Sequence, residues 1–295
     1  MTADAALFPG FEAKRVRTSN AEIAAVIGGD GPPLLLLHGY PQMHAMWHKV
    51  AAVLAQQFTV VCSDLRGYGD SSKPEGGERH VNYSKRVMAE DQVELMQALG
   101  FARFGVAGHD RGGRVAHRLT LDHPQAVTKL AVLDISPTRV MYGRTDKAFA
   151  TAYYHWFFLI QPYDLPERMI GADPAYYLRK KIGGWSRGLS YFDPRALAEY
   201  ERCFRDPAMI HASCEDYRAA AGIDLEHDAQ DESARIECPL LALWGDEGVV
   251  NRLFKPLDDW RSVALDVRGR ALRSGHFLPE EAPEDTCAEL LHFFR

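Results

Sequence analysis

Short apolar runs recur along the chain, and most of them end in a turn rich in Gly, Asp or His. The clearest runs lie at residues 34–37, 58–62, 104–108, 130–133 and 240–244. Continuous apolar runs of this length are typical of strands buried on both faces of a parallel sheet. Weaker patterns predict two short strands within residues 11–28, split by a polar turn, and another strand around residues 263–267.

Apolar residues at helical spacing lie between these strands. They predict helices over residues 84–99, from the turn after residue 108 to about residue 122, and over residues 283–294. Strands that alternate with helices in this way indicate an α/β fold with a doubly wound, mostly parallel sheet.

The pattern changes from residue 137 to about residue 230. Aromatic residues and arginines are dense there, no apolar strand run occurs, and Asp-Pro steps at 173–174, 193–194 and 206–207 are typical of helix starts. We therefore expect an inserted helical cap at residues 137–230. The core α/β domain would then comprise residues 1–136 and 231–295.

Composition and charge exclude several classes of protein. The chain has 295 residues, of which 46% are hydrophobic and 25% are charged, as is ordinary for a globular domain. A net charge of −6 without a basic tract argues against nucleic-acid binding. No apolar run is long enough to span a membrane, and no signal peptide is visible. The 5 cysteines are scattered without C-x-x-C spacing, so we expect reduced thiols in the cytoplasm and neither disulfides nor a metal site.

The strand at residues 104–108 runs into Gly108-His109-Asp110-Arg111-Gly112. A G-x-nucleophile-x-G stretch between a strand and a helix makes a sharp, strained turn that exposes its middle side chain at the edge of the sheet. Because Gly and Asp also form ordinary turns, the motif alone leaves a plain strand-to-helix turn as the alternative.

Other turns in the sequence decide between a nucleophile turn and a plain strand-to-helix turn. His38-Gly39-Tyr40-Pro41 follows an early strand, a D-x-R-G-x-G-x-S turn begins at Asp64, and a late loop contains Ser274-Gly275-His276-Phe277. Together with the turn at Asp110, in this order and over essentially the whole chain, they resemble the α/β-hydrolase superfamily.

An Asp where most such enzymes have Ser changes the chemistry that the resemblance implies. A carboxylate is ionised at neutral pH and suits displacement at an sp³ carbon or an epoxide, whereas Ser suits acyl transfer. Asp110 therefore narrows the class to dehalogenases and epoxide hydrolases. The resulting ester needs a histidine base to activate water, and the superfamily's chain order, nucleophile then acid then histidine, implies His276.

The acid that orients His276 has two candidates. In many members it follows the late strand as G-x-x-D, but that position here is Gly248. Asp134, directly after the strand at residues 130–133, occupies an alternative site used by some dehalogenases. We favour Asp134 over Asp246, since a shift in position re-aims a carboxylate. A simple turn or helix-capping role for Asp134 is the alternative.

The first turn after Asp110 is unusually basic. Arg111 and Arg114 lie one turn apart at a helix N-terminus, where cations oppose the helix dipole. Two forked donors beside the nucleophile suit a bidentate hold on a substrate carboxylate, whereas Arg118 is expected to be structural. The resemblance implies an oxyanion hole made by the backbone N–H groups of Tyr40 and Arg111.

Arg111 stands directly after Asp110, where related dehalogenases and epoxide hydrolases usually have Trp. In this respect the sequence resembles the haloacetate (fluoroacetate) dehalogenases. The likeness extends to Tyr154-His155-Trp156-Phe157 and to Cys214-Glu215-Asp216-Tyr217-Arg218. It implies that His155, Trp156 and Tyr217 donate hydrogen bonds to the leaving halide. By pattern alone, these aromatic residues could simply form the core of the cap.

The sequence thus predicts a hydrolase without a cofactor that cleaves the carbon–halogen bond of small haloacids, fluoroacetate foremost, through an ester on Asp110. An epoxide hydrolase is the first alternative, with Tyr154 and Tyr217 protonating the ring oxygen, but it leaves Arg111 and Arg114 unexplained. A non-catalytic ligand-binding protein is the second. The resemblance also implies a homodimer.

Overall fold

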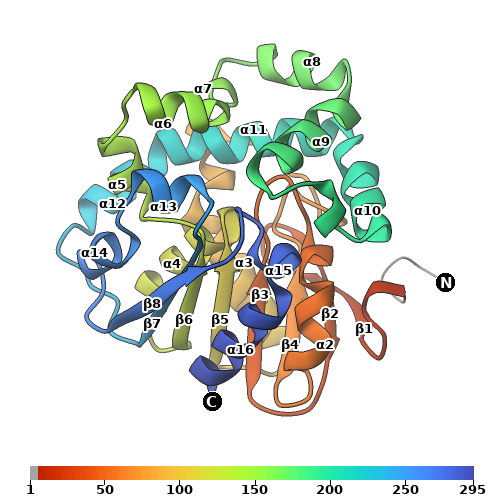
Figure 1. The fold of residues 1–295 in the computed structure, drawn as a ribbon, viewed down its shortest axis with the longest axis vertical. Helices are drawn as coiled ribbons and strands as arrows, with labels where there is room; N and C mark the ends of the chain where they lie inside the picture. The colour runs from red at the N-terminus through yellow and green to blue at the C-terminus, as the bar shows by residue number, and fades with distance from the viewer. Residues whose placement is uncertain (1–5) are drawn as a thin grey trace.

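The computed structural model describes residues 6–295 and contains one sheet with the strand order β1-β2-β4-β3-β5-β6-β7-β8 (Figure 1). Strands β1 and β2 pair antiparallel, as do β2 and β4, and all other neighbours pair in parallel. The strands are β1 (Glu12–Arg17), β2 (Glu22–Gly28), β3 (Pro33–Leu37), β4 (Thr59–Ser63), β5 (Phe104–His109), β6 (Val127–Leu133), β7 (Leu240–Gly245) and β8 (Val267–Leu272).

Helices cover both faces of this sheet. Helices α2 and α16 contact each other on one face, and α3 and α4 contact each other on the opposite face (Figure 1). The helices of this part are α2 (His48–Leu54), α3 (Lys85–Ala98), α4 (Arg111–Asp122), α13 (Val249–Leu253), α14 (Pro256–Arg261), α15 (Leu278–Glu281) and α16 (Pro283–Phe294), with short 3-10 turns η1 (His44–Trp47) and η2 (Glu78–Tyr83). The predicted doubly wound, mostly parallel α/β sheet is confirmed.

Residues 138–230 contain helices and no strand, and they lie over the carboxyl ends of the parallel strands (Figure 1). We call this segment the helical layer. It consists of α5 (Thr138–Gly143), α6 (Lys147–Ala152), α7 (Tyr154–Phe158), α8 (Leu165–Gly171), α9 (Pro174–Trp185), η3 (Leu189–Tyr191), α10 (Pro194–Phe204), α11 (Pro207–Ala221) and α12 (Ile223–Gln230). Each of the three Asp-Pro steps starts a helix, as predicted.

The prediction of a strand around residues 263–267 is wrong in its placement. Strand β8 begins at Val267, and the residues before it form the turn that ends α14. Val263 accepts a backbone hydrogen bond from Ile236, and Ala264 makes only an isolated bridge to Ile236. These apolar side chains therefore pack with the hydrophobic core without extending the sheet.

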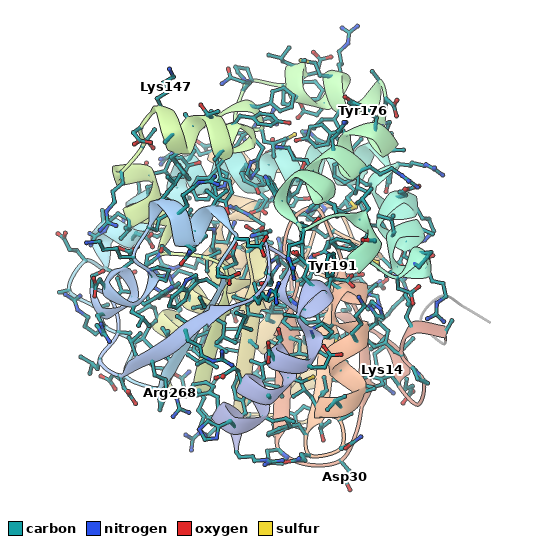
Figure 2. All side chains as sticks on the ribbon, viewed as in Figure 1. Lys14, Asp30, Lys147, Tyr176, Tyr191 and Arg268 are labelled. Carbon is teal, nitrogen blue, oxygen red and sulfur yellow. The ribbon has the colours of Figure 1, made fainter. Side chains whose placement is uncertain are left out.

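Side chains fill the space between the sheet and its helices, whereas Asp30, Lys147 and Tyr176 project from the surface (Figure 2). The central strands β3, β4 and β5 are buried along almost their whole length, as their apolar runs require. No helix within the described part of the chain is long and apolar enough to cross a membrane.

Candidate active site

The turn between β5 and α4 holds Asp110 in a strained conformation, with φ of 46° and ψ of −112°. Glycines make this turn possible, because a Cβ on Gly108 would lie 2.4 Å from the carbonyl oxygen of Gly112. A Cβ on Gly112 would lie 2.3 Å from the carbonyl oxygen of His38. The predicted sharp turn is therefore present, and strain of this kind concentrates at functional sites.

The two carboxylate oxygens of Asp110 have different surroundings. Oδ1 accepts a hydrogen bond of 3.0 Å from the backbone N–H of Tyr40, and the N–H of Arg111 begins α4, where no acceptor exists within the helix. Oδ2 lies 3.9 Å from Nε2 of His276. One oxygen thus accepts from the Tyr40 N–H of the predicted oxyanion hole, and the other faces the predicted base.

Asp134 contacts His276 and Asp246 does not. His276 Nδ1 and Asp134 Oδ2 are 2.6 Å apart, and the backbone N–H of Gly245 donates a 2.9 Å hydrogen bond to Asp134 Oδ1. Asp246 is exposed and accepts instead from the backbone of Ser274. The structure therefore forms a line of three groups, from the Asp110 carboxylate through the His276 imidazole to the buried Asp134 carboxylate.

These contacts shift the proton affinities of the three groups. Burial alone would raise the pKa of Asp110, but the charges of His276, the adjacent histidine and the two arginines hold it below its usual value. Burial alone would lower the pKa of His276, yet the hydrogen bond and charge of Asp134 and the charge of Asp110 raise it above 6.5. Asp110 is therefore ionised at neutral pH, as a nucleophile must be.

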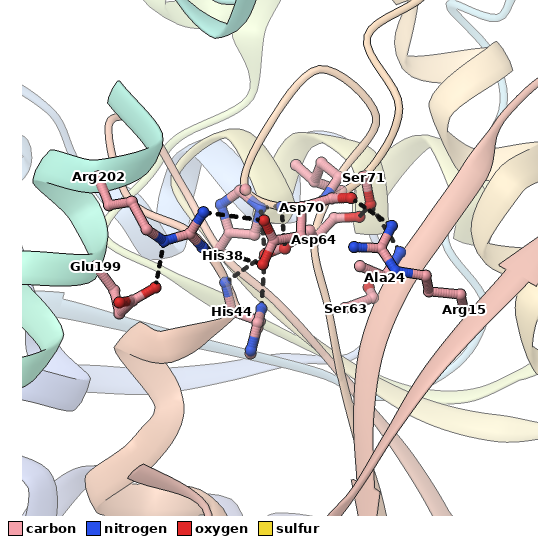
Figure 3. A network of polar contacts seen from close by, with 12 residues as sticks. Arg15, Ala24, His38, His44, Ser63, Asp64, Asp70, Ser71, Glu199 and Arg202 are labelled. Carbon is pink, nitrogen blue, oxygen red and sulfur yellow. Dashed lines mark hydrogen bonds and ion pairs between the residues drawn. The ribbon is translucent and has the colours of Figure 1, made fainter. Parts of the chain in front are cut away.

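A second buried carboxylate, Asp64, holds the loop that carries Tyr40 (Figure 3). It accepts hydrogen bonds from the backbone N–H groups of His44, at 2.7 Å, and Asp70, at 2.8 Å. The next residue, Leu65, donates its N–H to Nε2 of His38 over 3.0 Å. The D-x-R-G-x-G-x-S turn is therefore structural, and it places the Tyr40 N–H beside the nucleophile.

The two arginines lie in the site, but neither offers a free fork. Arg111 donates from Nε and Nη2 to the carboxylate of Asp216 over 2.8 and 2.7 Å. Arg114 donates from Nη1 to Thr138 Oγ1 and to a backbone carbonyl. What remains are Nη1 of Arg111 and Nε of Arg114, which are buried and have no partner within residues 6–295.

The predicted halide-binding side chains surround these arginines. The Arg111 guanidinium carbon lies 4.2 Å from the ring centre of Tyr217, and that of Arg114 lies 4.7 Å from the ring of Trp156. The ring centres of His155 and Tyr217 are 5.4 Å apart. All three aromatic residues are buried, and they come from the separate helices α7 and α11.

Polar atoms of these residues and of His276 are buried without hydrogen-bond partners within residues 6–295. They are His155 Nδ1, Trp156 Nε1, Tyr217 Oη, Arg111 Nη1, Arg114 Nε and His276 Nε2. Leaving one such group buried and unpaired costs about 1–3 kcal/mol. Several of these groups lie close to the Asp110 carboxylate, an arrangement that suits a ligand rich in hydrogen-bond acceptors.

Trp185 is a residue of this site that sequence analysis did not identify. Trp185 lies between the predicted halide site and the predicted base, 4.4 Å from the ring of His155 and 5.5 Å from that of His276. It also helps to line a polar cavity of about 130 Å³ that reaches His276, Gly248 and Arg252. Nothing in the sequence around Trp185 distinguishes it from a core aromatic residue. No group of His, Cys, Asp or Glu suited to a metal occurs among the described residues.

The chain is similar to known proteins over most of its length. A family model described as alpha/beta hydrolase fold matches residues 32–251. A fluoroacetate dehalogenase from Burkholderia sp is 49% identical, with 97% of this chain and 95% of that protein covered. A soluble epoxide hydrolase from Corynebacterium sp. (strain C12) is 36% identical over 91% of this chain and 92% of that protein. The crystal structure of a putative α/β hydrolase from Nostoc sp PCC 7120 matches with a TM-score of 0.95 and 61% identity, covering 96% of this chain and 97% of that one.

Proposed function

The chain belongs to the α/β-hydrolase family, and we propose that within it this protein is a hydrolase that releases halide from haloacetates, fluoroacetate foremost. The products would be glycolate and halide, and no cofactor takes part. The observation that carries the proposal is the set of buried, unpartnered donors around Asp110. The 49% identity to a fluoroacetate dehalogenase supports it.

The donors fall into two groups that match the two ends of a haloacetate. Nη1 of Arg111 and Nε of Arg114 suit a carboxylate, because charged N–H donors bind it most strongly. Trp156 and Tyr217 supply one N–H and one O–H for the halogen. Burial and the charge of Lys181 lower the pKa of His155 well below 6.5, so its ring is neutral, and the tautomer protonated at Nδ1 would supply a further N–H.

In the first step, Oδ2 of Asp110 attacks the carbon that bears the halogen. A C–O bond forms, the C–F or C–Cl bond breaks, and the halide leaves with the bonding electrons. Fluoride is strongly basic, so several converging donors are needed to stabilise it as it departs. Oδ1, already hydrogen-bonded to the Tyr40 N–H, becomes the carbonyl oxygen of the ester.

In the second step, Nε2 of His276 takes a proton from water, and the resulting hydroxide attacks the carboxyl carbon of Asp110. The N–H groups of Tyr40 and Arg111 stabilise the tetrahedral intermediate. Asp134 stabilises the imidazolium, as the acid does in a Ser-His-Asp triad. Collapse of the intermediate breaks the ester C–O bond, the departing alkoxide of glycolate takes the proton from the His276 imidazolium, and the carboxyl group of Asp110 loses its proton to solvent.

An epoxide hydrolase is the second candidate, favoured by the identity to the Corynebacterium enzyme. The same Asp110 would open the ring, and a tyrosine would protonate the oxygen. Tyr217 is buried with a free hydroxyl, whereas Tyr154 is 49% exposed. An epoxide, however, has no carboxylate to occupy the donors of Arg111 and Arg114.

Halide release from purified protein tests this proposal directly. We expect fluoride from fluoroacetate and chloride from chloroacetate, and little turnover of neutral chloroacetamide or styrene oxide. Asp110→Asn should abolish release and serves as the control for contaminating activity. Diol formation from an epoxide without halide release from either haloacid would replace the proposal with its rival.

A single turnover in ¹⁸O-water tests the covalent step. Water attacks the carboxyl carbon, so label should enter the side chain of Asp110 and be found on its peptide by mass spectrometry. Label that appears only in glycolate during this first turnover would show direct attack by water on the substrate.

Three further expectations accompany the proposal. We propose that residues 137–230 act as a cap, since they supply His155, Trp156 and Tyr217 to a site on the sheet. The exposed side chains of Tyr163 and Met169 support a homodimer. The cysteines are free among the described residues, which supports the cytoplasm as the location.

A further inference from the structure

Asp216 is a fully buried carboxylate that the proposed reaction does not use. It lies on α11 and receives hydrogen bonds from Arg111 and from the hydroxyl of Tyr68, the latter at 2.7 Å. Lys85, the first residue of α3, makes an ion pair with Oδ1 of Asp216, to which Arg111 Nη2 also donates. One side chain of the helical layer is thus bound by three segments of the α/β core.

Asp216 competes with any substrate carboxylate for Arg111. Nη2 of Arg111 donates both to the carboxylate of Asp216 and to its backbone carbonyl, at 2.7 and 3.0 Å, and Nε donates to the carboxylate at 2.8 Å. Only Nη1 is left without a partner in the described chain. A substrate anion would therefore meet a guanidinium whose charge is already offset by a resident anion.

Lys85 offsets the charge of Asp216 in turn. Burial alone would raise the pKa of Asp216, but Arg111 and Lys85 hold it far below its usual value, so the carboxylate stays charged. Lys85 is buried and also lies 3.4 Å from Asp224. Arg111 and Lys85 balance Asp216 and Asp224, so the four side chains are neutral together. Removing Lys85 would leave a net negative charge beside the arginine that faces the substrate.

We propose that Asp216 and Lys85 are positioning residues for substrate binding. Together they set how the Arg111 guanidinium is oriented and how strongly it binds the substrate carboxylate. Asp216 holds Nε and Nη2 of the guanidinium, which leaves Nη1 as the nitrogen that is free for the substrate. Lys85 keeps Asp216 from cancelling the charge that the substrate needs. This inference rests on the proposed function, since it assumes an anionic substrate.

Steady-state kinetics with chloroacetate tests the inference. Lys85→Met should raise KM by about tenfold or more while kcat changes by less than about threefold. The reason is that the bound substrate and the transition state both carry the carboxylate and should lose about the same binding free energy. Arg86→Met is the matched control. It removes the neighbouring cation, which pairs with Asp122 and Asp231 and not with Asp216, and it should leave KM unchanged.

The double variant Lys85→Met with Asp216→Asn separates charge from packing. Removing both charges restores neutrality, so KM should fall clearly below the Lys85→Met value, whereas damage to packing would add up. Full recovery is not expected, because Asn keeps only one of the two oxygens that hold Arg111. Lys85→Gln gives the same comparison should the methionine variant not fold. The inference is overturned if Lys85→Met behaves like Arg86→Met, or if the double variant is no better than Lys85→Met. Absence of halide release from the wild type would instead refute the proposed function.

Discussion

Trp156 and Tyr217 each bring one unpaired donor to the buried site, and their contribution depends on the halide that leaves. Fluoride accepts hydrogen bonds more strongly than chloride, so donors that act on the departing ion should matter more for C–F cleavage. A side chain that merely packs in the core would affect both substrates alike.

We therefore expect Trp156→Phe and Tyr217→Phe to lower kcat/KM for fluoroacetate by about 1–3 kcal/mol of transition-state stabilisation, with a smaller loss for chloroacetate. The ratio of the two kcat/KM values is the quantity to measure, because general damage to the fold cancels in it. An unchanged ratio in both variants would assign these residues to core packing.

His276 lies between two carboxylates, and one of them loses its charge during the proposed reaction. Asp110 is among the groups that raise the pKa of His276, and its ester carries no charge. The pKa of His276 should therefore be lower in the intermediate than in the free protein, which makes the imidazole a base when water must be activated.

The rate of ester hydrolysis should fall as the pH drops through this lowered pKa, because protonated His276 cannot accept a proton. Rapid-quench mass spectrometry of the Asp110 peptide across the neutral range gives this rate, and NMR titration gives the pKa of His276 in the free protein. A kinetic midpoint at or above the NMR value would contradict the argument.

At the residue scale, motifs led to Asp110, Asp134 and His276 because their chain order and flanking turns are local features. The pairing of Arg111 with Asp216 spans 105 positions and leaves no local trace, so the sequence suggested two free forks. The structure instead leaves one nitrogen of each arginine available.

At the scale of elements, helix starts were the easiest features to predict. Asp173, Asp193 and Asp206 each precede a proline, and each side chain accepts a hydrogen bond from the backbone of the helix that follows. Both the N-cap and the first-turn proline are local preferences. The position of β8 was not predictable in this way, since a turn before it carries equally apolar residues.

The N-cap residue Asp206 should stabilise α11 by a measurable free energy. This helix carries both Asp216 and Tyr217. Asp206→Ala should lower the free energy of unfolding by about 1 kcal/mol, because the N–H of Ala208 loses its acceptor. Asp206→Asn keeps an acceptor and should stay within about 0.5 kcal/mol of the wild type. Urea unfolding followed by circular dichroism measures both, and equal losses would rule out a capping role.

At the scale of the whole molecule, the helical layer and the α/β core are joined by a hydrogen bond at His276, the proposed catalytic base. The backbone N–H of His276 donates a 2.8 Å hydrogen bond to the carbonyl of Trp185, at the end of α9. The alternation of strands and helices predicted the sheet and the helical layer above it. It could not predict this junction, because two loops distant in the chain meet there by packing alone. The boundaries at residues 137 and 230 stay a prediction.

Strands β6 and β7 end side by side. Asp134, after β6, contacts the imidazole of His276, and Gly248, after β7, lines the same cavity as His276. Asp134 follows β6, and a Cβ on Gly248, after β7, would lie 3.3 and 3.6 Å from the two oxygens of Asp134. Asp134→Asn should slow turnover by roughly 10⁴, by analogy with a Ser-His-Asp triad, whereas Asp246→Asn should have little effect. Adding Gly248→Asp to Asp134→Asn should recover at least about tenfold in kcat. No recovery would show that only β6 can supply the acid.

Gly248 thus leaves room for the carboxylate of Asp134. A shared imidazole with two adjacent strand ends lets a lineage move its acid from one strand to the next while the nucleophile and the base stay fixed. A glycine at one end then marks where the acid is absent, because a side chain there would crowd the carboxylate on the other strand. Within this family, the residue at position 248 should vary together with the residue at position 134.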